Sequence, residues 1–368
     1  MPHKGLKPLR IAMVAPPWFQ VPPEGYGGIE WMAYWLTEGL VALGHEVTLI
    51  GAGQNNTSAN FHSTFEEPPS LRLGEPLPEA IHHAKAMQII DDLDVDVIHD
   101  HTLMGPLLAR TRKAPTVITA HGPVDGEVSD YFTAMGDKIH LVAISEAQRR
   151  KAPQLAWAGT VRNAIPVDDY TFRSVKEDFV LFLGRMSPEK GVHLAIEAAR
   201  EAGHHLVIAA KCNEPLEYEY LEEEVRPRLG PWAEWIGEAD AVTKKDLLSR
   251  ARCLLFPIRW EEPFGIVMVE ALASGTPVVA LTGGSVPEVV LHGETGYVFD
   301  KPDELVKGIE EAALIDPEAC RDYAKKHFDI DRMVLGYESL YRQITLGERL
   351  ERLPQIVHKD QESLKLGV

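Results

Sequence analysis

Cysteine is rare in this sequence, with three residues among 368, at Cys212, Cys253 and Cys320. Their odd number and wide spacing exclude a disulfide framework and a zinc site built from thiolates. Unpaired cysteines are typical of proteins in a reducing compartment. We therefore expect a cytoplasmic protein.

Long hydrophobic runs are also missing, because no apolar stretch approaches the roughly 20 residues that a membrane-spanning helix needs. The apolar run at 11–14 is too short for a secretory signal, and Pro16 and Pro17 interrupt it. We interpret it as a first buried strand. The sequence predicts a soluble protein, and peripheral contact with a membrane stays open but is not favoured.

Positive charge is in deficit, with 37 Lys and Arg against 55 Asp and Glu and a formal net charge of -18. Such an excess of negative charge repels polyphosphate backbones, so nucleic acid is not an expected partner. An anionic ligand must instead be held by a few local cations, helix N-termini and backbone amides.

The first half of the sequence alternates short apolar runs, rich in β-branched residues, with longer stretches of helical periodicity. This pattern predicts a parallel sheet covered by helices on both faces, a Rossmann-like α/β unit. A packed helix is expected at 29–43, ending near Gly44. We predict strands at 10–15, 46–50, 95–99, 116–120 and 139–144.

The same alternation restarts after residues 163–166 and a polar stretch that ends at Asp178. Two such units side by side leave a cleft between the carboxyl edges of their sheets, and ligands bind there. We predict further strands at 179–183, 205–210, 233–236, 253–256 and 277–281. We expect one domain over 1–166, a second over 167–330, and a helix with a charged tail over 331–368 that packs back toward the first domain.

The strongest chemical signal is the segment 262–270, Glu-Pro-Phe-Gly-Ile-Val-Met-Val-Glu, which follows a predicted strand and begins a helix. The turn before Gly265 sets a helix N-terminus, where free amides and the helix dipole favour a diphosphate or a sugar hydroxyl. Glu262 and Glu270 lie about two helical turns apart and flank this site. Alternatively, both are ordinary helix-end and surface residues.

A second signal is the segment 184–191, Gly-Arg-Met-Ser-Pro-Glu-Lys-Gly, after the first strand of the second unit. Arg185 and Lys190 supply two cations at a strand's carboxyl end, from which a leaving diphosphate can be neutralised. The alternative is a solvated loop with a helix that begins at Ser187 or Pro188.

A third signal is the glycine pair Gly27 and Gly28, between the first strand and its helix. Without side chains, their amides can approach a phosphate closely. A plain tight turn is the alternative, because the full GxGxxG pattern is absent. The loop 16–25 ahead of the pair, rich in Pro and aromatic residues, is a candidate lid on the acceptor side.

Histidines form the fourth signal: His99 and His101 at the end of one predicted strand, and His121 at the end of its neighbour. Side chains at this edge enter the cleft of an α/β protein. The three, with Asp100, have the ligand types of a metal site, but no HExxH or comparable motif accompanies them. His121, followed by Gly122, is the one we assign to the active site.

Together these segments resemble the GT-B glycosyltransferases of family 4, a large retaining group, over nearly the whole chain. The glycine pair, His121, the 184–191 segment and the 262–270 segment occur in the family's order. The resemblance implies the GT-B architecture, in which two Rossmann-like domains face each other across a cleft. It also implies transfer of a hexosyl group from a nucleotide diphosphate sugar.

The resemblance implies a role for each matching residue. Arg185 and Lys190 would bind the donor diphosphate and stabilise it as it departs, and the Gly27 and Gly28 turn would offer an amide to the same group. Glu270 would hold the ribose, and His121 would lie near the donor sugar. Glu262 would contact hydroxyls of that sugar, beside the amides of Phe264, Gly265 and Ile266.

The family also implies a mechanism without a metal or another cofactor. Retention is explained there by front-face attack, with the departing phosphate accepting the proton of the acceptor. A glycosidase with paired carboxylates fits poorly, because Glu262 and Glu270 lie along one loop and helix rather than on opposite sides of a scissile bond.

Two features depart from the family or remain open. The turn at Asn163 and Ala164 stands where the family commonly has Asn followed by Gly, so Asn163 is left out of the predicted site. The basic clusters 110–113 and 149–151 resemble lipid-docking segments of some members, but a solvated helix face is the expected structure for each.

Two other functions fit the same cleft: a nucleotide-sugar epimerase, and a noncatalytic nucleotide-sugar sensor. The acceptor is not identified by the sequence, and loops 16–25, 61–78 and 122–136 of the first domain are where it is expected to bind. A UDP-sugar is favoured over a GDP-sugar, with UDP-glucose as the default donor.

Overall fold

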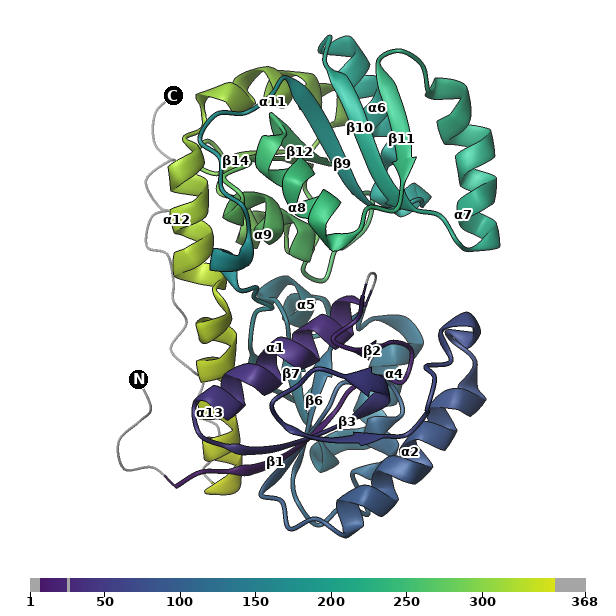
Figure 1. The fold of residues 1–368 in the computed structure, drawn as a ribbon, viewed down its shortest axis with the longest axis vertical. Helices are drawn as coiled ribbons and strands as arrows, with labels where there is room; N and C mark the ends of the chain where they lie inside the picture. The colour runs from purple at the N-terminus through teal and green to yellow at the C-terminus, as the bar shows by residue number, and fades with distance from the viewer. Residues whose placement is uncertain (1–6, 25–26, 348–368) are drawn as a thin grey trace.

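The structure is a computed structural model that describes residues 7–24 and 27–347. In this part of the chain the strands form two parallel sheets, each in its own layered α/β domain (Figure 1). The first domain lies below the second in Figure 1, and the predicted architecture of two α/β domains is confirmed. No helix among the described residues is long and apolar enough to cross a membrane.

The first sheet has the strand order β2-β3-β1-β5-β6-β7-β8, with β4 paired to β3. Its strands are β1 (Arg10–Val14), β2 (Gln20–Val21), β3 (Glu46–Asn55), β4 (Asn60–Ser63), β5 (Val97–Asp100), β6 (Thr116–Ala120), β7 (His140–Ala143) and β8 (Trp157–Thr160). Its helices are α1 (Gly28–Ala42), α2 (Pro76–Asp91), α3 (Gly105–Leu108), α4 (Gly126–Met135) and α5 (Glu146–Lys151).

The second sheet has the order β11-β10-β9-β12-β13-β14. Its strands are β9 (Phe179–Arg185), β10 (His205–Lys211), β11 (Ala233–Gly237), β12 (Cys253–Phe256), β13 (Val278–Leu281) and β14 (Gly296–Phe299). Its helices are α6 (Val192–Glu201), α7 (Pro215–Tyr220), α8 (Ala241–Arg250), α9 (Ile266–Ala273), α10 (Val286–Val289), α11 (Leu305–Glu311) and α12 (Pro317–Phe328).

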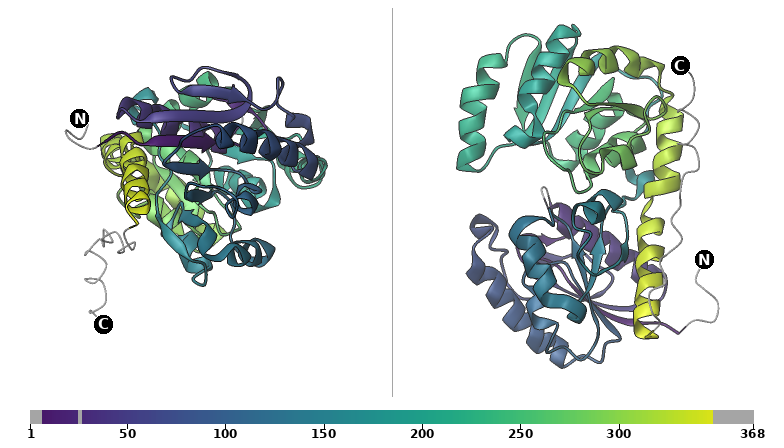
Figure 2. Two further views of the ribbon diagram at one scale, coloured as in Figure 1. Left: turned by 90° about the horizontal axis from the view of Figure 1, so that it is seen from below. Right: turned by 180° about the vertical axis from the view of Figure 1, so that it is seen from behind.

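The chain crosses between the domains twice, and the two crossings are hydrogen-bonded to each other. Ile165 donates its amide to the carbonyl of Phe328 (3.0 Å) and accepts from the amide of Ile330 (3.0 Å). After the second crossing, α13 (Ile330–Thr345) runs down the side of the first domain (Figures 1 and 2). Its Tyr337 and Tyr341 are buried in the core of that domain together with Leu36 of α1.

Each predicted strand is present, whereas four strands had not been predicted: β2, β4, β8 and β14. All four lie at sheet edges, where a strand needs no continuous apolar run. Three segments expected to be loops contain regular structure. Segment 16–25 includes β2, 61–78 includes the end of β4 and the start of α2, and 122–136 includes α4. The charged tail expected after Leu350 lies outside the described residues.

The basic cluster 110–113 is not a solvated helix face, so that prediction was wrong. The segment lies beyond the end of α3, and the Arg112 side chain is fully buried. Its Nη2 donates to Asp100 Oδ2 at 2.7 Å, at the end of β5. The local sequence has no sign of this pairing, because the partner is supplied by a neighbouring strand. The second cluster, on α5, does lie partly in solvent.

Helices α1 and α13 pack so closely at Gly39 that a Cβ there would collide with the side chain of Val334. Because Val334 is β-branched and stiff, it cannot swing away. We expect Gly39→Ala to lower the free energy of unfolding by about 1 to 3 kcal/mol through overpacking. Leu335→Ala on the exposed side of α13 is the control and should cost about 0.5 kcal/mol or less. Urea unfolding of both variants tests this, and equal stabilities would contradict it.

Candidate functional site between the two domains

The centre of the site is an ion pair between Lys190 and Glu262. Lys190 follows β9, Glu262 lies in the loop between β12 and α9, and Nζ is 2.5 Å from Oε2. The indole Nε1 of Trp260 donates to the same carboxylate oxygen at 2.9 Å. The ammonium also lies over the rings of Trp260 (5.0 Å) and Phe256 (5.7 Å). A carboxylate and two aromatic faces thus hold this charge at the carboxyl edge of the second sheet.

A glycine allows the two loops to approach. Gly191 has φ 72°, and a Cβ there would overlap the carbonyl oxygen of Pro257 in the loop after β12. The amide of Arg259 donates to the carbonyl of Glu189 at 2.8 Å, which ties the same loops together. A short 3-10 helix over Pro188–Lys190, with Ser187 at its N-cap, begins where the sequence alternative placed a helix start. The longer helix α6 begins at Val192, beyond Gly191.

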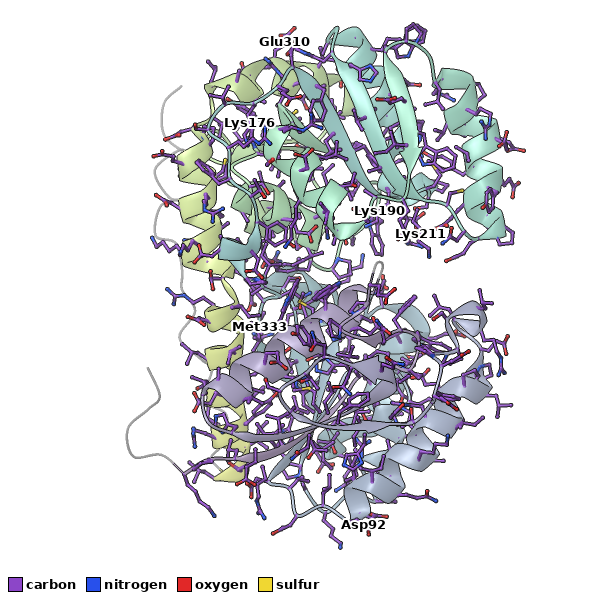
Figure 3. All side chains as sticks on the ribbon, in the orientation of Figure 1. Asp92, Lys176, Lys190, Lys211, Glu310 and Met333 are labelled. Carbon is purple, nitrogen blue, oxygen red and sulfur yellow. The ribbon has the colours of Figure 1, made fainter. Side chains whose placement is uncertain are left out.

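Arg185 is held by acidic neighbours rather than against Lys190. Its Nη2 lies 2.9 Å from Glu189 Oε1, and its Nη1 lies 4.0 Å from the buried Glu217. Within the described residues no hydrogen bond or ion pair joins Arg185 to Lys190. Lys211, which pairs in register with Arg185 at the end of β10, is a third cation at this edge. Figure 3 shows Lys190 and Lys211 on the side of the second domain that faces the first.

Gly265 caps α9 with φ 70°, as the sequence predicted for a helix start at this turn. The side chain of Phe264 is buried against Phe328, with ring centroids 6.0 Å apart, so Phe264 can offer a ligand only its backbone. Ile266 packs against the apolar cores of both domains. The N-terminus of α9 is therefore positioned at the domain interface.

Glu270, on the buried side of α9, accepts hydrogen bonds from Tyr170 Oη (2.7 Å) and Lys244 Nζ (2.6 Å). Burial and the charge of Glu270 raise the pKa of Tyr170. Both bonds go to Oε1, and no side chain among the described residues hydrogen-bonds to Oε2. The second carboxylate oxygen is thus the one that a ligand hydroxyl can use.

Gly27 and Gly28 lie at the start of α1, as predicted. Gly27 has φ 145° and a Cβ there would overlap Pro23, whereas a Cβ on Gly28 would meet nothing within 4 Å. Packing therefore does not require glycine at position 28, and its backbone is open to approach. Glu30, in the first turn of the helix, is buried, and this burial raises its pKa to about 7. Tyr26 lies outside the described residues.

His121 follows β6 and is half-buried at the end of a series of hydrogen-bonded side chains whose other members are buried. Its Nε2 lies 2.8 Å from Nδ1 of His101, whose Nε2 lies 3.1 Å from the sulfur of Met13. The ring of His99 lies against that of His101, with centroids 4.1 Å apart, and it hydrogen-bonds to Tyr341 Oη (2.6 Å) and Thr119 Oγ1 (2.8 Å). Each of these ring nitrogens faces another ring nitrogen, a hydroxyl or the sulfur. The histidines therefore form a series of hydrogen bonds. No three His, Cys, Asp or Glu side chains in the described ranges could together hold a metal ion.

A pocket of about 210 Å³ joins the two domains at this point. From the first domain it is lined by the loop after His121 and by α5, and from the second by the loops after β12 and β13. The carboxyl edges of the two sheets therefore meet, as the two-domain prediction required. Its lining residues are Pro123, Val124, Asp125, Ala147, Gln148, Lys151, Trp260, Glu261, Glu262, Pro263 and Gly284.

Glu288 is an interdomain residue that had not been predicted. This carboxylate of α10 accepts from the amides of Glu146 (3.0 Å) and Ala147 (2.5 Å), at the N-terminus of α5 in the first domain. Arg162 Nη2 also donates to it at 3.3 Å. The sequence did offer a signal, since a glycine pair precedes Glu288 after a strand, as at the start of α1. Trp260 and Gln148 of the pocket had no comparable signal.

Burial of the histidines predicts that stability falls in acid. Burial lowers the pKa of His99 to about 3 and that of His121 to about 4. Below about pH 6.5 the unfolded chain binds protons that these folded side chains do not, so the free energy of unfolding decreases as the pH falls. At about pH 5 the loss is about 2 kcal/mol for His99. Glu30 acts in the opposite direction, because its folded pKa is raised.

A difference measurement isolates His99 from the other groups. We expect the stability gap between the wild-type protein and His99→Asn to narrow by about 2 kcal/mol between about pH 7.5 and pH 5, since only the wild type carries this buried imidazole. Urea unfolding at the two pH values measures the gap. A gap that stays constant, or widens in acid, would show that His99 is protonated in the folded protein.

The two halves of the chain match two family models. Residues 26–177 match the model described as Glycosyltransferase Family 4, and residues 170–327 match Glycosyl transferases group 1. The chain is 26% identical to a glycogen synthase of Mycobacterium tuberculosis, covering 95% of this chain and 99% of the relative. It is 25% identical to a phosphatidyl-myo-inositol mannosyltransferase of Mycobacterium leprae, covering 85% and 89%.

The arrangement of the domains is matched in a solved structure. AviGT4, a glycosyltransferase involved in avilamycin A biosynthesis, superposes with a TM-score of 0.72 at 28% identity. The match covers 92% of this chain and 99% of that one. Since sequence models match both domains and the fold matches across the cleft, the chain is a member of the GT-B superfamily of glycosyltransferases.

Proposed function

We propose that this glycosyltransferase is a retaining hexosyltransferase that uses a nucleotide diphosphate sugar, by default UDP-glucose, and needs no metal ion. The observation that carries the proposal is the Lys190 and Glu262 pair, which lies beside a pocket shared by both domains. A cation and a hydroxyl-binding carboxylate held together at a helix N-terminus match the two ends of a sugar diphosphate.

Lys190 has the position to neutralise the departing diphosphate. Its side chain is only 15% exposed, so its charge is weakly screened by water. A diphosphate that carries more charge than one carboxylate competes with Glu262 for the ammonium. Glu262, at the tip of the loop before α9, then accepts hydrogen bonds from hydroxyls of the hexose. Arg185 adds a second cation once the diphosphate draws it from Glu189.

The amides at the start of α9 supply the rest of the anion site. The peptide groups at Phe264, Gly265 and Ile266 precede or open the helix, where the dipole favours negative charge. On the other side of the cleft, the backbone of Gly27 and Gly28 opens α1 in the same way. Glu270, with Oε2 free of side-chain partners among the described residues, binds the ribose.

Front-face attack accounts for retention with these residues. The leaving phosphate accepts the proton of the attacking hydroxyl, so no strong base is required from the protein. Glu262 and Glu270 lie at the two ends of one loop and helix, both in the second domain. They are therefore not placed on opposite faces of a scissile bond, as paired-carboxylate hydrolysis requires.

The relatives support a hexosyl donor without selecting the acceptor. One is named a glycogen synthase and another a phosphatidyl-myo-inositol mannosyltransferase, so both names describe sugar transfer. The acceptor binds in the first domain, beside His121 and the loop that follows it. Three buried, unpaired cysteines support a cytoplasmic location.

An assay of nucleotide release tests the function. We expect the wild-type protein to release UDP from UDP-glucose in the presence of one acceptor from a panel of sugars, lipids and small molecules, with EDTA causing no loss of activity. Conversion of the donor to another nucleotide sugar without acceptor would identify an epimerase. Donor binding without release for any acceptor would identify a sensor, and loss of activity in EDTA would refute metal independence.

Replacement of the central cation gives a second test. We expect Lys190→Ala to lower kcat by about 10² to 10³ fold, the usual effect of removing a group that stabilises transition-state charge. Lys307→Ala is the matched control, since that lysine is 66% exposed on α11, and it should retain wild-type kcat. A Lys190→Ala variant with more than about a tenth of wild-type activity would contradict the assigned role.

A further inference from the structure

Met13, His101 and His121 form a hydrogen-bonded series of side chains. The series ends at the thioether sulfur of Met13, which cannot donate a proton. Met13 is fully buried in β1, and its sulfur lies 3.1 Å from Nε2 of His101. At the other end, Nε2 of His121 lies 2.8 Å from Nδ1 of His101. His101 follows β5 and His121 follows the adjacent strand β6, so both rings lie at the edge of the sheet that borders the cleft.

Only one placement of the N–H protons on His101 and His121 gives every contact in this series a donor and an acceptor. A neutral imidazole has one N–H and one bare nitrogen, and a thioether sulfur can only accept. His101 must therefore carry its proton on Nε2, facing the sulfur, and its Nδ1 is bare. The nitrogen that faces this Nδ1 must then donate, so His121 is protonated on Nε2. Its second nitrogen, Nδ1, is left bare.

The reverse arrangement is disfavoured by its cost in a buried site. A bare Nε2 on His101 would point its lone pair at the lone pairs of sulfur, and an unpaired buried acceptor is destabilising. The ring of His101 lies against that of His99, with centroids 4.1 Å apart. His99 is itself held by Tyr341 of α13 and by Thr119. These two partners are hydroxyls that can donate or accept, so only the sulfur end sets a direction.

Burial also keeps the rings uncharged. It lowers the pKa of His121 to about 4 and that of His101 well below its usual value, and a proton on His99 would oppose one on His101. At neutral pH each ring therefore has a single N–H to place, as the proton count assumes.

We propose that Met13 and His101 are positioning residues that hold His121 in the tautomer with a bare Nδ1, so that His121 accepts a hydrogen bond from a hydroxyl of the bound hexose. The hydrogen bond to the hexose rests on the proposed function, whereas the assignment of the tautomer does not depend on it. No side chain among the described residues hydrogen-bonds to Nδ1 of His121, so this nitrogen is available to a ligand. Through this nitrogen His121 can accept a hydrogen bond from a hydroxyl group, but it has no proton there to donate to the ligand.

The tautomer is measured directly by NMR of the full-length protein labelled with ¹⁵N in histidine, without any ligand. We expect His101 and His121 each to show the shifts of an Nε2–H, Nδ1-bare ring, with coupling across the hydrogen bond between His121 Nε2 and His101 Nδ1. A proton on Nδ1 of either ring overturns the proposal. Because no nucleotide is present, this outcome is independent of whether the chain transfers hexose.

A pair of variants tests the consequence for binding. The side-chain oxygen of His101→Asn can replace Nδ1 as the acceptor for His121, whereas His101→Leu removes it. We expect His101→Leu to weaken binding of UDP-glucose about tenfold, the effect of one lost hydrogen bond, with binding of UDP unchanged. His101→Asn should stay within about threefold of the wild type for both ligands.

Either of two results would overturn the role of His101. One is a His101→Leu variant that binds UDP-glucose as the wild type does, and the other is a His101→Asn variant as impaired as His101→Leu. If UDP binding is also lost in His101→Leu, that variant is misfolded. The NMR measurement on the wild-type protein then decides whether the tautomer assignment is correct. If the wild type binds UDP but not UDP-glucose, the proposed donor fails while the tautomer assignment stands.

Discussion

The Lys190 and Glu262 ion pair is the interaction on which the arrangement of the cleft depends. The protein is strongly acidic, and an ammonium that is largely buried would attract neighbouring carboxylates unless one were built in at a defined place. Glu262 fills that place, and the indole of Trp260 orients it. The close packing at Gly191 and Pro257 brings their two loops together. An incoming diphosphate, which carries more negative charge, can therefore replace Glu262 as the partner of the Lys190 ammonium.

The two domains are joined in a way that keeps this pair opposite the first domain. Two neighbouring crossings at Ile165 and Asp329 form a narrow connection, and α13 continues from the second into the core of the first domain. Glu288 adds a contact on the other side of the interface by accepting from the amides that open α5. A change in the domain angle must therefore break or rearrange the Glu288 contact, whereas the paired crossings can stay intact.

The domains contribute different chemistry to the cleft. The second domain provides charges, in Lys190, Arg185 and the two glutamates, which suits an anionic donor. The first domain provides neutral imidazoles, since burial keeps His99 and His121 uncharged at physiological pH, and its Asp125 and Lys151 also line the pocket. Its buried network extends from Thr119 through His99 to Tyr341, so the helix that ends the described chain also supports the histidines nearest the cleft.

The alternation of strands and helices, the division into two α/β units, and the motifs around Gly27, Lys190 and Glu262 could be predicted from the amino-acid sequence alone. These are local patterns, because strand and helix periods and glycine turns depend on residues close together in the chain. Which side chains contact one another could not be predicted in this way, because it depends on the fold of the whole chain. Lys190 and Glu262 are 72 positions apart, and His99 and Tyr341 are 242 apart. Burial of Arg112 beside Asp100, and the order of Met13, His101 and His121, follow from strand pairing, which brings together residues that no local pattern relates.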